Sequence, residues 1–326
     1  MTDREEPTEQ LLELGSDDLR LTLATLGARV HRLRVRDAEG AWRDVVLGLP
    51  RVADALDDDA YLGATVGRYA NRIARGELVV DGTTHALATN DGGHTLHGGP
   101  DGFDRRTWTV VEVGPAAAEL ELVSPDGDQG FPGTVTVRAR FEVRGRTLRT
   151  SYAATTDAPT VVSLSSHAYY RLGGEDLAGH ELTLHADAYL PVVDGVPTGE
   201  VADVTGTPFD LRAGRRPAAD LDHPFVVRGC GSGEDEWAPG GPLREVAVLR
   251  GHGLVLTVAS DQPGVQVYTG GAFSGRFHAP GAGVAIEPQL HPDSPHHAGE
   301  PGWPSAELRP DGTYRWTSDI SVTPDR

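Results

Sequence analysis

Three side chains in this sequence are candidates for acid–base chemistry: Glu287, His167 and His97. Glu287 follows a short apolar run, residues 283–286, that is typical of a buried strand. A carboxylate held at the end of a rigid strand can act as a general base. Pro288 comes next and lacks an N–H, so we expect strand pairing to stop there. Alternatively, Glu287 is an exposed residue at the end of a strand. Buried partners for its carboxylate would favour the general base over this alternative.

His167 is the first candidate partner. It comes after residues 161–164, a mainly apolar run that indicates a strand, and is followed by the aromatic residues Tyr169 and Tyr170. An imidazole at a strand end beside flat aromatic rings suits a sugar ligand. A core histidine bonded to a backbone carbonyl is equally consistent with these residues alone.

The loop at residues 92–99 carries His94 and His97 among glycines that allow close approach of a ligand. Zinc would need a third ligand, and the sequence offers neither a cysteine partner nor an HExxH helix. A phosphate loop would need a following helix and a Lys-Ser/Thr pair, which are also missing. The paired His296 and His297 are more typical of a solvated loop than of a metal site. We therefore expect no metal, and an imidazole that donates a hydrogen bond or a proton.

The elements that must position these groups are strands. Alternation of apolar and polar residues with a period of two predicts many short half-buried strands. The clearest examples are residues 19–23, 31–35, 108–113, 119–123, 135–143, 148–152, 181–185 and 254–258. Helical periodicity is confined to two short stretches, 52–56 and 218–221. This pattern favours one large all-β sandwich or barrel over residues 19–326, preceded by an acidic segment at residues 1–18, although two packed β halves remain an alternative.

Composition limits the partners. The chain has 29 Lys+Arg against 48 Asp+Glu, a formal net charge of −19, which disfavours nucleic acid and anionic lipid and favours a neutral or cationic small ligand. The single cysteine, Cys230, excludes an internal disulfide framework and indicates a reducing compartment. The acidic start lacks a signal-peptide pattern, and no apolar run approaches the roughly 20 residues of a membrane span. We expect a cytoplasmic protein with no membrane contact.

The chain resembles the aldose 1-epimerase family, also called galactose mutarotases, in six segments that occur in the family's order from about Leu19 onward. The segments are Gly-Arg-x-Ala-Asn-Arg-Ile at 67–73, Leu-His-Gly-Gly at 96–99 with Gly-Phe-Asp at 102–104, Ser-His-x-Tyr at 166–169, Asp-His-x-Phe at 222–225, Gly-x-Gln-x-Tyr-Thr-Gly at 264–270, and Glu-Pro-Gln at 287–289. The resemblance implies a large antiparallel β-sandwich of the galactose mutarotase type, with few short helices.

The resemblance also implies an activity and roles for single residues. It implies interconversion of the α and β anomers of free hexoses such as galactose and glucose, without a cofactor, by a monomer or homodimer. Glu287 would be the general base, His167 the general acid and His97 a second catalytic or substrate-polarising imidazole. The implied substrate-binding residues are Asn71, Arg72, Asp222, Gln266 and Tyr169.

This chemistry requires a charged Glu287 and a protonated His167 near neutral pH. An unperturbed histidine is mostly neutral there, so we expect nearby carboxylates such as Asp222 to favour the imidazolium.

Three other functions remain open. An epimerase of phosphorylated hexoses would need a basic cluster, for which Arg68, Arg72 and Arg75 are the only candidates. A sugar-binding protein without catalysis would be expected to have lost Glu287 or His167, and both are present. A metal-dependent hydrolase would have to use the histidines at 94, 97, 296 and 297.

Overall fold

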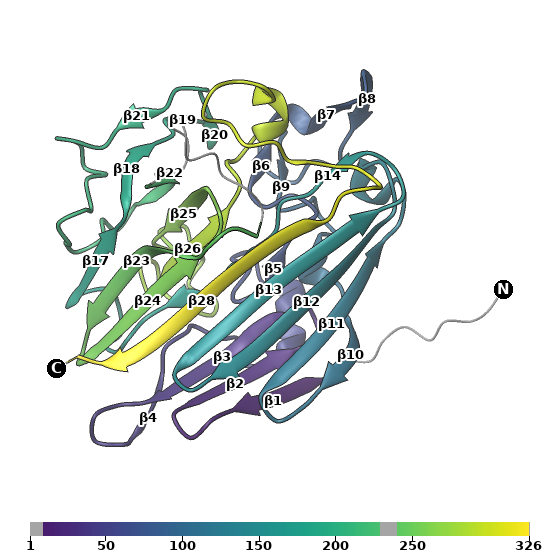
Figure 1. Cartoon of the computed structure of the whole chain (residues 1–326). Helices are drawn as coiled ribbons and strands as arrows, with labels where there is room; N and C mark the ends of the chain where they lie inside the picture. Colours follow the sequence, from purple (N-terminus) through teal and green to yellow (C-terminus); the bar gives the residue numbers. More distant parts are fainter. Residues whose placement is uncertain (1–8, 229–239, 326) are drawn as a thin grey trace.

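The computed structural model describes residues 9–228 and 240–325, and antiparallel sheets make up most of it (Figure 1). Cys230 lies outside the described residues. The largest sheet has eight strands in the order β10 (Thr109–Val113), β11 (Ala117–Ser124), β12 (Val135–Arg144), β13 (Thr147–Thr156), β28 (Tyr314–Pro324), β24 (Leu254–Ser260), β23 (Arg244–Gly251) and β17 (His180–Leu184). The predicted all-β antiparallel class is confirmed.

Two further sheets lie behind the eight-stranded sheet in Figure 1. One has six strands, in the order β16 (Tyr169–Tyr170), β26 (Val284–Gln289), β25 (Gly264–Tyr268), β22 (Asp222–Val227), β18 (Ala186–Tyr189) and β21 (Ala202–Asp203). The other has four, in the order β1 (Leu11–Gly15), β2 (Leu19–Ala24), β3 (Arg29–Arg36) and β4 (Trp42–Asp44). β1 pairs with β2 along its whole length, so residues 11–15 contribute a strand ahead of residue 19.

Short elements connect these sheets. The strand pairs are β5 (Thr65–Val66) with β15 (Ser165–Ser166), β6 (Arg72–Ile73) with β9 (Thr95–Leu96), β7 (Glu77–Val80) with β8 (Thr83–Ala86), β14 (Thr160–Val161) with β27 (Glu307–Leu308), and β19 (Val192–Val193) with β20 (Val196–Pro197). The 3-10 turns are η1 (Val52–Asp57), η2 (Ala74–Gly76), η3 (Phe103–Arg105), η4 (Asp128–Gly130) and η5 (Ser294–His297). The helical expectation at 52–56 corresponds to η1, whereas residues 218–221 form a turn and that expectation is wrong. Among the described residues, no helix has the length and apolar character needed to cross a bilayer.

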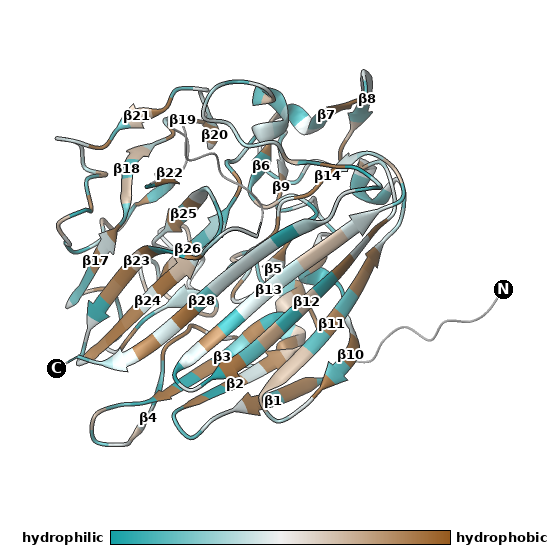
Figure 2. Cartoon of the chain, in the orientation of Figure 1, coloured by the Kyte–Doolittle hydropathy of each residue, from teal (hydrophilic) through white to brown (hydrophobic). Residues whose placement is uncertain are grey.

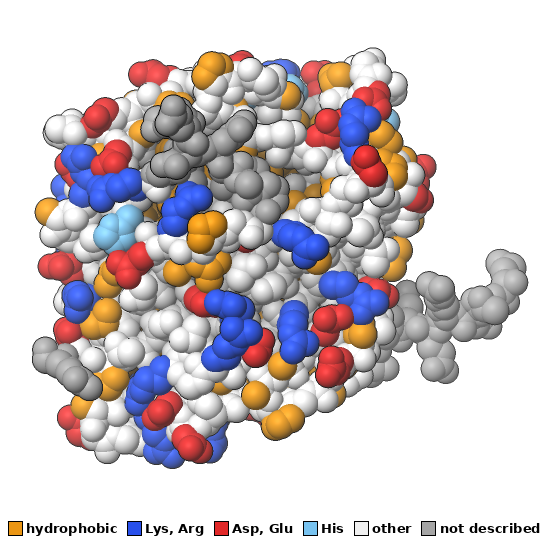
Figure 3. All heavy atoms as spheres, viewed as in Figure 1, with side chains coloured by type: hydrophobic (Ala, Val, Ile, Leu, Met, Phe, Trp, Pro, Cys, Tyr) orange, Lys and Arg blue, Asp and Glu red, His pale blue; other side chains and the backbone are white. Residues whose placement is uncertain are grey.

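Alternation along the strands places one side chain in the core and the next in solvent. In β12, Val135, Val137, Ala139 and Phe141 are buried and the residues between them are not, which Figure 2 shows as alternating colours. These side chains join a single core cluster with residues of β2, β3, β25 and β26. The outer face carries mixed arginine and acidic side chains (Figure 3), with ion pairs across neighbouring strands. One hydrophobic core therefore lies between the eight-stranded sheet and the other two.

β26 differs from the expectation at its end. Pairing with β25 continues through Pro288 to Gln289, so the prediction that the ladder stops at Pro288 is wrong. The carbonyl of Pro288 accepts hydrogen bonds from Ser165 Oγ at 2.9 Å and Trp316 Nε1 at 2.7 Å, neither of which belongs to β25. In an antiparallel strand the N–H and C=O of one residue point to the same side. The N–H that proline lacks is therefore on the side away from β25, and the ladder is not interrupted.

Candidate active site

A cavity of about 270 Å³ opens beside the six-stranded sheet. All eight residues that the sequence predicts to be catalytic or substrate-binding line it: Asn71, Arg72, His97, His167, Tyr169, Asp222, Gln266 and Glu287. They come from segments more than 200 residues apart in the chain. The structure therefore brings the complete predicted set into one place.

Strand register explains part of this convergence. Gln266 of β25 lies directly opposite Glu287 of β26, and Asp222 of β22 lies opposite Tyr268 at the end of β25. Because directly opposed residues share a face of the sheet, Gln266 and Glu287 project to the same side. His167 lies between β15 and β16, where its N–H donates to the carbonyl of Ala64 at 2.8 Å. Three neighbouring strands and one connection thus form the floor of the cavity.

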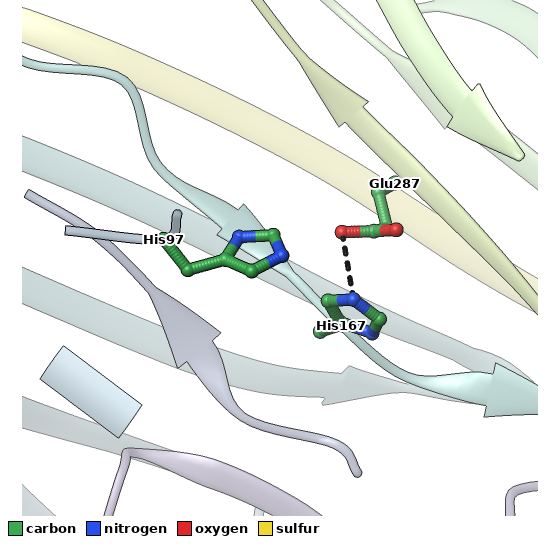
Figure 4. Close-up of side chains that lie close together, drawn as sticks. All are labelled: His97, His167 and Glu287. Carbon is green, nitrogen blue, oxygen red and sulfur yellow. Dashed lines mark ion pairs between the residues drawn. The ribbon is translucent and has the colours of Figure 1, made fainter. Parts of the chain in front are cut away.

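Glu287 and His167 form the centre of the site. Nε2 of His167 lies 3.5 Å from Oε2 of Glu287, and their side chains are 5% and 1% exposed (Figure 4). Burial raises the pKa of Glu287 well above its usual range, and the nearby Asp222 charge raises it further. Burial also lowers the pKa of His167 to about 3. Both groups favour their neutral forms in the ligand-free cavity.

The expected imidazolium at His167 is therefore wrong for this state of the protein. The expectation assigned the dominant effect to neighbouring carboxylates, but removing both groups from water outweighs it. Asp222 acts on Glu287, making that carboxyl harder to ionise, and not on His167. Both shifts favour a proton on Glu287 over one on His167 in the ligand-free cavity.

The ring of His97 is held by a hydrogen bond at Nδ1. The backbone N–H of Asn71 donates to Nδ1 of His97 at 3.1 Å, which places the proton of the neutral ring on Nε2. Burial lowers the pKa of His97 well below its usual range, so the ring stays neutral. One ring nitrogen of His97 points toward Glu287 and His167 in Figure 4. Since Nδ1 is occupied by Asn71, this nitrogen is Nε2, and His97 can donate a hydrogen bond into the cavity.

The polar residues around this centre have defined partners. Nε of Arg72 donates to Asp91 at 2.7 Å, and the carboxamide oxygen of Asn71 accepts from the Arg72 N–H at 2.8 Å. Asn71 lines the cavity, and its NH₂ group takes no part in this hydrogen bond. Nε2 of Gln266 donates to Asp222 at 2.6 Å, while its oxygen is buried without a partner among the described residues. The cavity therefore presents both hydrogen-bond donors and acceptors, which hydroxyl groups can pair with.

His97, His167 and Glu287 could also be considered as a metal site, because they present ligand atoms within 4.8 Å of one another. The tautomer argues against this use. With its proton on Nε2, His97 offers no lone pair toward the other two residues. His167 and Glu287 alone make an incomplete ligand set for zinc. The arrangement fits proton transfer better than metal binding.

The aromatic residues that line the cavity, apart from Tyr169, were not predicted from the sequence. Tyr61 lines the cavity, as do Phe273 and Phe277 of the glycine-rich segment after β25. Aromatic residues there have no periodic pattern that would identify them, although flat apolar surfaces are typical of a sugar site. His94, His296 and His297 are absent from the lining residues. His94 instead accepts the Arg75 N–H at 3.1 Å, and the other two interact with Asp293 and Glu300.

Comparisons with known proteins point to one family. The family model for aldose 1-epimerase matches residues 10–321. The galactose mutarotase of Bos taurus is 37% identical over 329 residues, covering 95% of this chain and 93% of the relative. The aldose 1-epimerase of Escherichia coli (strain K12) is 35% identical over 319 residues, covering 90% and 89%. The crystal structure of an aldose epimerase homologue from C. elegans superposes with a TM-score of 0.88 at 28% identity, covering 98% of this chain and 100% of the other.

Proposed function

Because the chain belongs to the aldose 1-epimerase family and is a mutarotase that interconverts the α and β anomers of sugars, we propose that Glu287 and His167 carry its proton transfers. One observation carries this assignment. The two groups lie 3.5 Å apart, buried, at the centre of a cavity that all the predicted binding residues line. A base and an acid adjacent to one ligand are what the ring opening of a hexose needs.

The reaction removes the proton of the C1 hydroxyl and delivers a proton to the ring oxygen. The C1–O5 bond breaks, the C1 oxygen becomes the carbonyl of a free aldehyde, and O5 becomes a hydroxyl. Rotation about C1–C2 exposes the other face of the carbonyl, and the reverse transfers close the ring as the other anomer. Glu287 accepts the first proton and His167 supplies the second, so the pair returns to its starting protonation after each cycle.

The resting pair must change its protonation before this step. Its single proton has to move from Glu287 to His167, which produces a carboxylate and an imidazolium. Sugar hydroxyls that donate to the carboxylate favour that charged form, because hydrogen bonds to an ionised group lower its pKa. His97, which keeps a donor toward the cavity, can polarise the sugar oxygen that it contacts. Substrate binding thus favours the ionised Glu287 and protonated His167 that the reaction requires.

Neutral hexoses such as galactose and glucose fit this cavity better than phosphorylated ones. Of the three arginines that could have formed a phosphate cluster, only Arg72 lines the cavity, and it is paired with Asp91. The Arg68 guanidinium is buried elsewhere, where it donates to carbonyl oxygens such as those of Pro132 and Gly133. The Arg75 side chain is 66% exposed and nearest to Glu77. A phosphate would meet no free cation of this motif.

Polarimetry tests the proposed function directly. Freshly dissolved α-D-galactose and α-D-glucose should reach their equilibrium rotation faster with the protein than in buffer alone. Galactose 6-phosphate and glucose 6-phosphate should be accelerated at least about 100-fold less, because Arg72, the motif arginine that lines the cavity, is already paired with Asp91. Preferential acceleration of the phosphorylated sugars would reject this substrate assignment. A protein that binds hexoses without accelerating mutarotation would reject the mechanism.

The contact of Arg72 with sugar hydroxyls can be tested through Gly195, at the turn between β19 and β20. A methyl group at residue 195 would lie 2.7 Å from Cζ of Arg72, and Gly195 has φ of +77°. Gly195→Ala should displace the guanidinium and raise KM for galactose about fivefold with little change in kcat. Gly206→Ala is the matched control, since Gly206 has φ of +75° and no atom within 4 Å of an added methyl. Equal effects of the two variants would show backbone strain instead of a role for Arg72.

Composition supports a proposal for the cellular compartment and the partners of the protein. A single cysteine, Cys230, favours a reducing compartment such as the cytoplasm. The net charge of −19 disfavours nucleic acid and anionic membranes as partners. A monomer or homodimer stays the prediction for the oligomeric state.

A further inference from the structure

Tyr61 contacts both imidazoles of the site. Its ring centroid lies 4.6 Å from that of His97 at an interplanar angle of 59°, and 5.7 Å from that of His167 at 28°, a stacked arrangement. The side chain is half-buried and lines the cavity. None of the six segments that resemble the epimerase family includes it.

A buried ion pair holds the backbone on both sides of Tyr61. The Asp58 carboxylate accepts the N–H groups of Ala60 at 3.0 Å and Leu62 at 2.7 Å. The same carboxylate pairs with Arg29 at 3.2 Å, and both side chains are 1% exposed. Tyr61 has φ of +56°, a left-handed conformation that an ordinary residue keeps only when its surroundings impose it. Asp58, paired with Arg29, therefore holds the backbone on both sides of Tyr61 in this conformation.

The same segment continues into His167. The N–H of Gly63 donates to the carbonyl of His167 at 3.0 Å, and the His167 N–H donates to the carbonyl of Ala64 at 2.8 Å. Tyr61 and His167 are thus carried by two chain segments that are hydrogen-bonded to each other. These bonds hold the two backbone segments next to each other, and the orientation of each ring depends on what its side chain packs against.

His167 needs such support because the polar contact that its ring makes with the described residues, Nε2 to Oε2 of Glu287, is long at 3.5 Å. A catalytic histidine is usually oriented through its second nitrogen, as Asn71 orients His97. Nδ1 of His167 is buried and has no hydrogen-bond partner among the described residues. Its ring is bounded by three others, those of Tyr61, His97 and Tyr169, with centroids at 5.7, 5.2 and 5.1 Å. Packing must therefore set the direction of Nε2.

We propose that Tyr61 is a positioning residue that orients His167 and His97 for proton transfer by ring packing, with the Asp58–Arg29 ion pair as its anchor. The proposal rests on the proposed catalytic role of His167. The rate of proton transfer depends steeply on geometry. If the His167 imidazole were free to turn, kcat would fall while the affinity for the sugar would stay the same. The contacts with both imidazoles are made by the aromatic ring of Tyr61, so the positioning role belongs to the ring and not to the hydroxyl.

Kinetics of two variants separate the ring from the hydroxyl. Tyr61→Phe should keep kcat for galactose mutarotation within about threefold of wild type, while Tyr61→Leu should lower kcat about tenfold or more with KM within about threefold. A Tyr61→Leu variant that raises KM and keeps kcat would overturn the proposal, because Tyr61 would then act as a sugar contact. A Tyr61→Phe variant as impaired as Tyr61→Leu would also overturn it. Tyr61→Met is measured in place of Tyr61→Leu if the latter does not fold.

A second measurement needs no turnover and is independent of the proposed function. In protein with ¹³C-labelled histidine, the imidazole signals of His97 and His167 should be single and narrow in wild type and Tyr61→Phe. They should broaden or split in Tyr61→Leu, because the rings then sample more than one orientation. Narrow, single signals in Tyr61→Leu would overturn the positioning role. A lack of mutarotase activity in the wild-type protein would reject the proposed function. The line widths would still show whether Tyr61 orients the imidazole rings.

Discussion

Glu287→Gln should lower kcat for galactose mutarotation by about 10³- to 10⁴-fold, close to the uncatalysed background. Glutamine keeps the size and shape of the side chain but cannot accept the C1 hydroxyl proton. The loss corresponds to about 4.1 to 5.4 kcal/mol of transition-state stabilisation. Polarimetry of fresh α-D-galactose, with the buffer rate subtracted, measures it.

Folding is not expected to explain this loss. Glu287 is 1% exposed, and burial disfavours its charged form, so a neutral amide should fit at least as well. The thermal midpoint of Glu287→Gln should therefore equal or exceed that of wild type. Glu287→Asp is an intermediate control, because it keeps a carboxyl group but shortens the side chain by one methylene. Its kcat should lie between those of wild type and Glu287→Gln. Wild-type activity in Glu287→Gln would remove Glu287 from the mechanism.

The eight predicted site residues could be identified because each belongs to a segment that resembles the aldose 1-epimerase family, whereas other polar lining residues such as Asp59 and Ser274 belong to none. His97 lies among glycines, and Asn71 adopts φ of +66° in a stretch where alternation fails. Such departures from regular patterning concentrate at functional sites. The strands could be predicted for a different reason: side chains of β12 and β13 alternate between core and solvent, and that alternation is visible in the sequence.

Other features could not be predicted because they depend on three-dimensional surroundings. Pro288 was expected to end a ladder, but the side to which its missing N–H points is set by the position of β25. The protonation of His167 was expected from nearby charges, whereas complete burial governs it. Tyr61 is one aromatic residue after the acidic run 57–59, and only the folded chain brings it to His97 and His167.

His167→Asn should lower kcat about 10²- to 10³-fold, because it removes the group that protonates the ring oxygen and leaves Glu287 in place. Asparagine cannot exchange a proton with Glu287 near neutral pH, so the carboxyl would retain its proton and lose its function as a base. Burial holds the pKa of Glu287 well above its usual range, and with His167 absent the carboxylate should form only as the pH rises. The residual activity of His167→Asn should therefore increase with pH over a range in which wild type is nearly constant. A residual rate independent of pH would contradict this coupling.

The double variant Glu287→Gln/His167→Asn tests whether the two residues act as one unit. If they acted in separate steps, their losses would multiply to about 10⁵-fold or more. Because His167 lies 3.5 Å from Glu287 and exchanges its proton with that carboxyl, removing Glu287 should already disable both transfers. The double variant should then be no slower than Glu287→Gln alone, as in other sites whose members function only together. A multiplicative loss would show that each group retains activity without the other, and the shared proton would have to be abandoned.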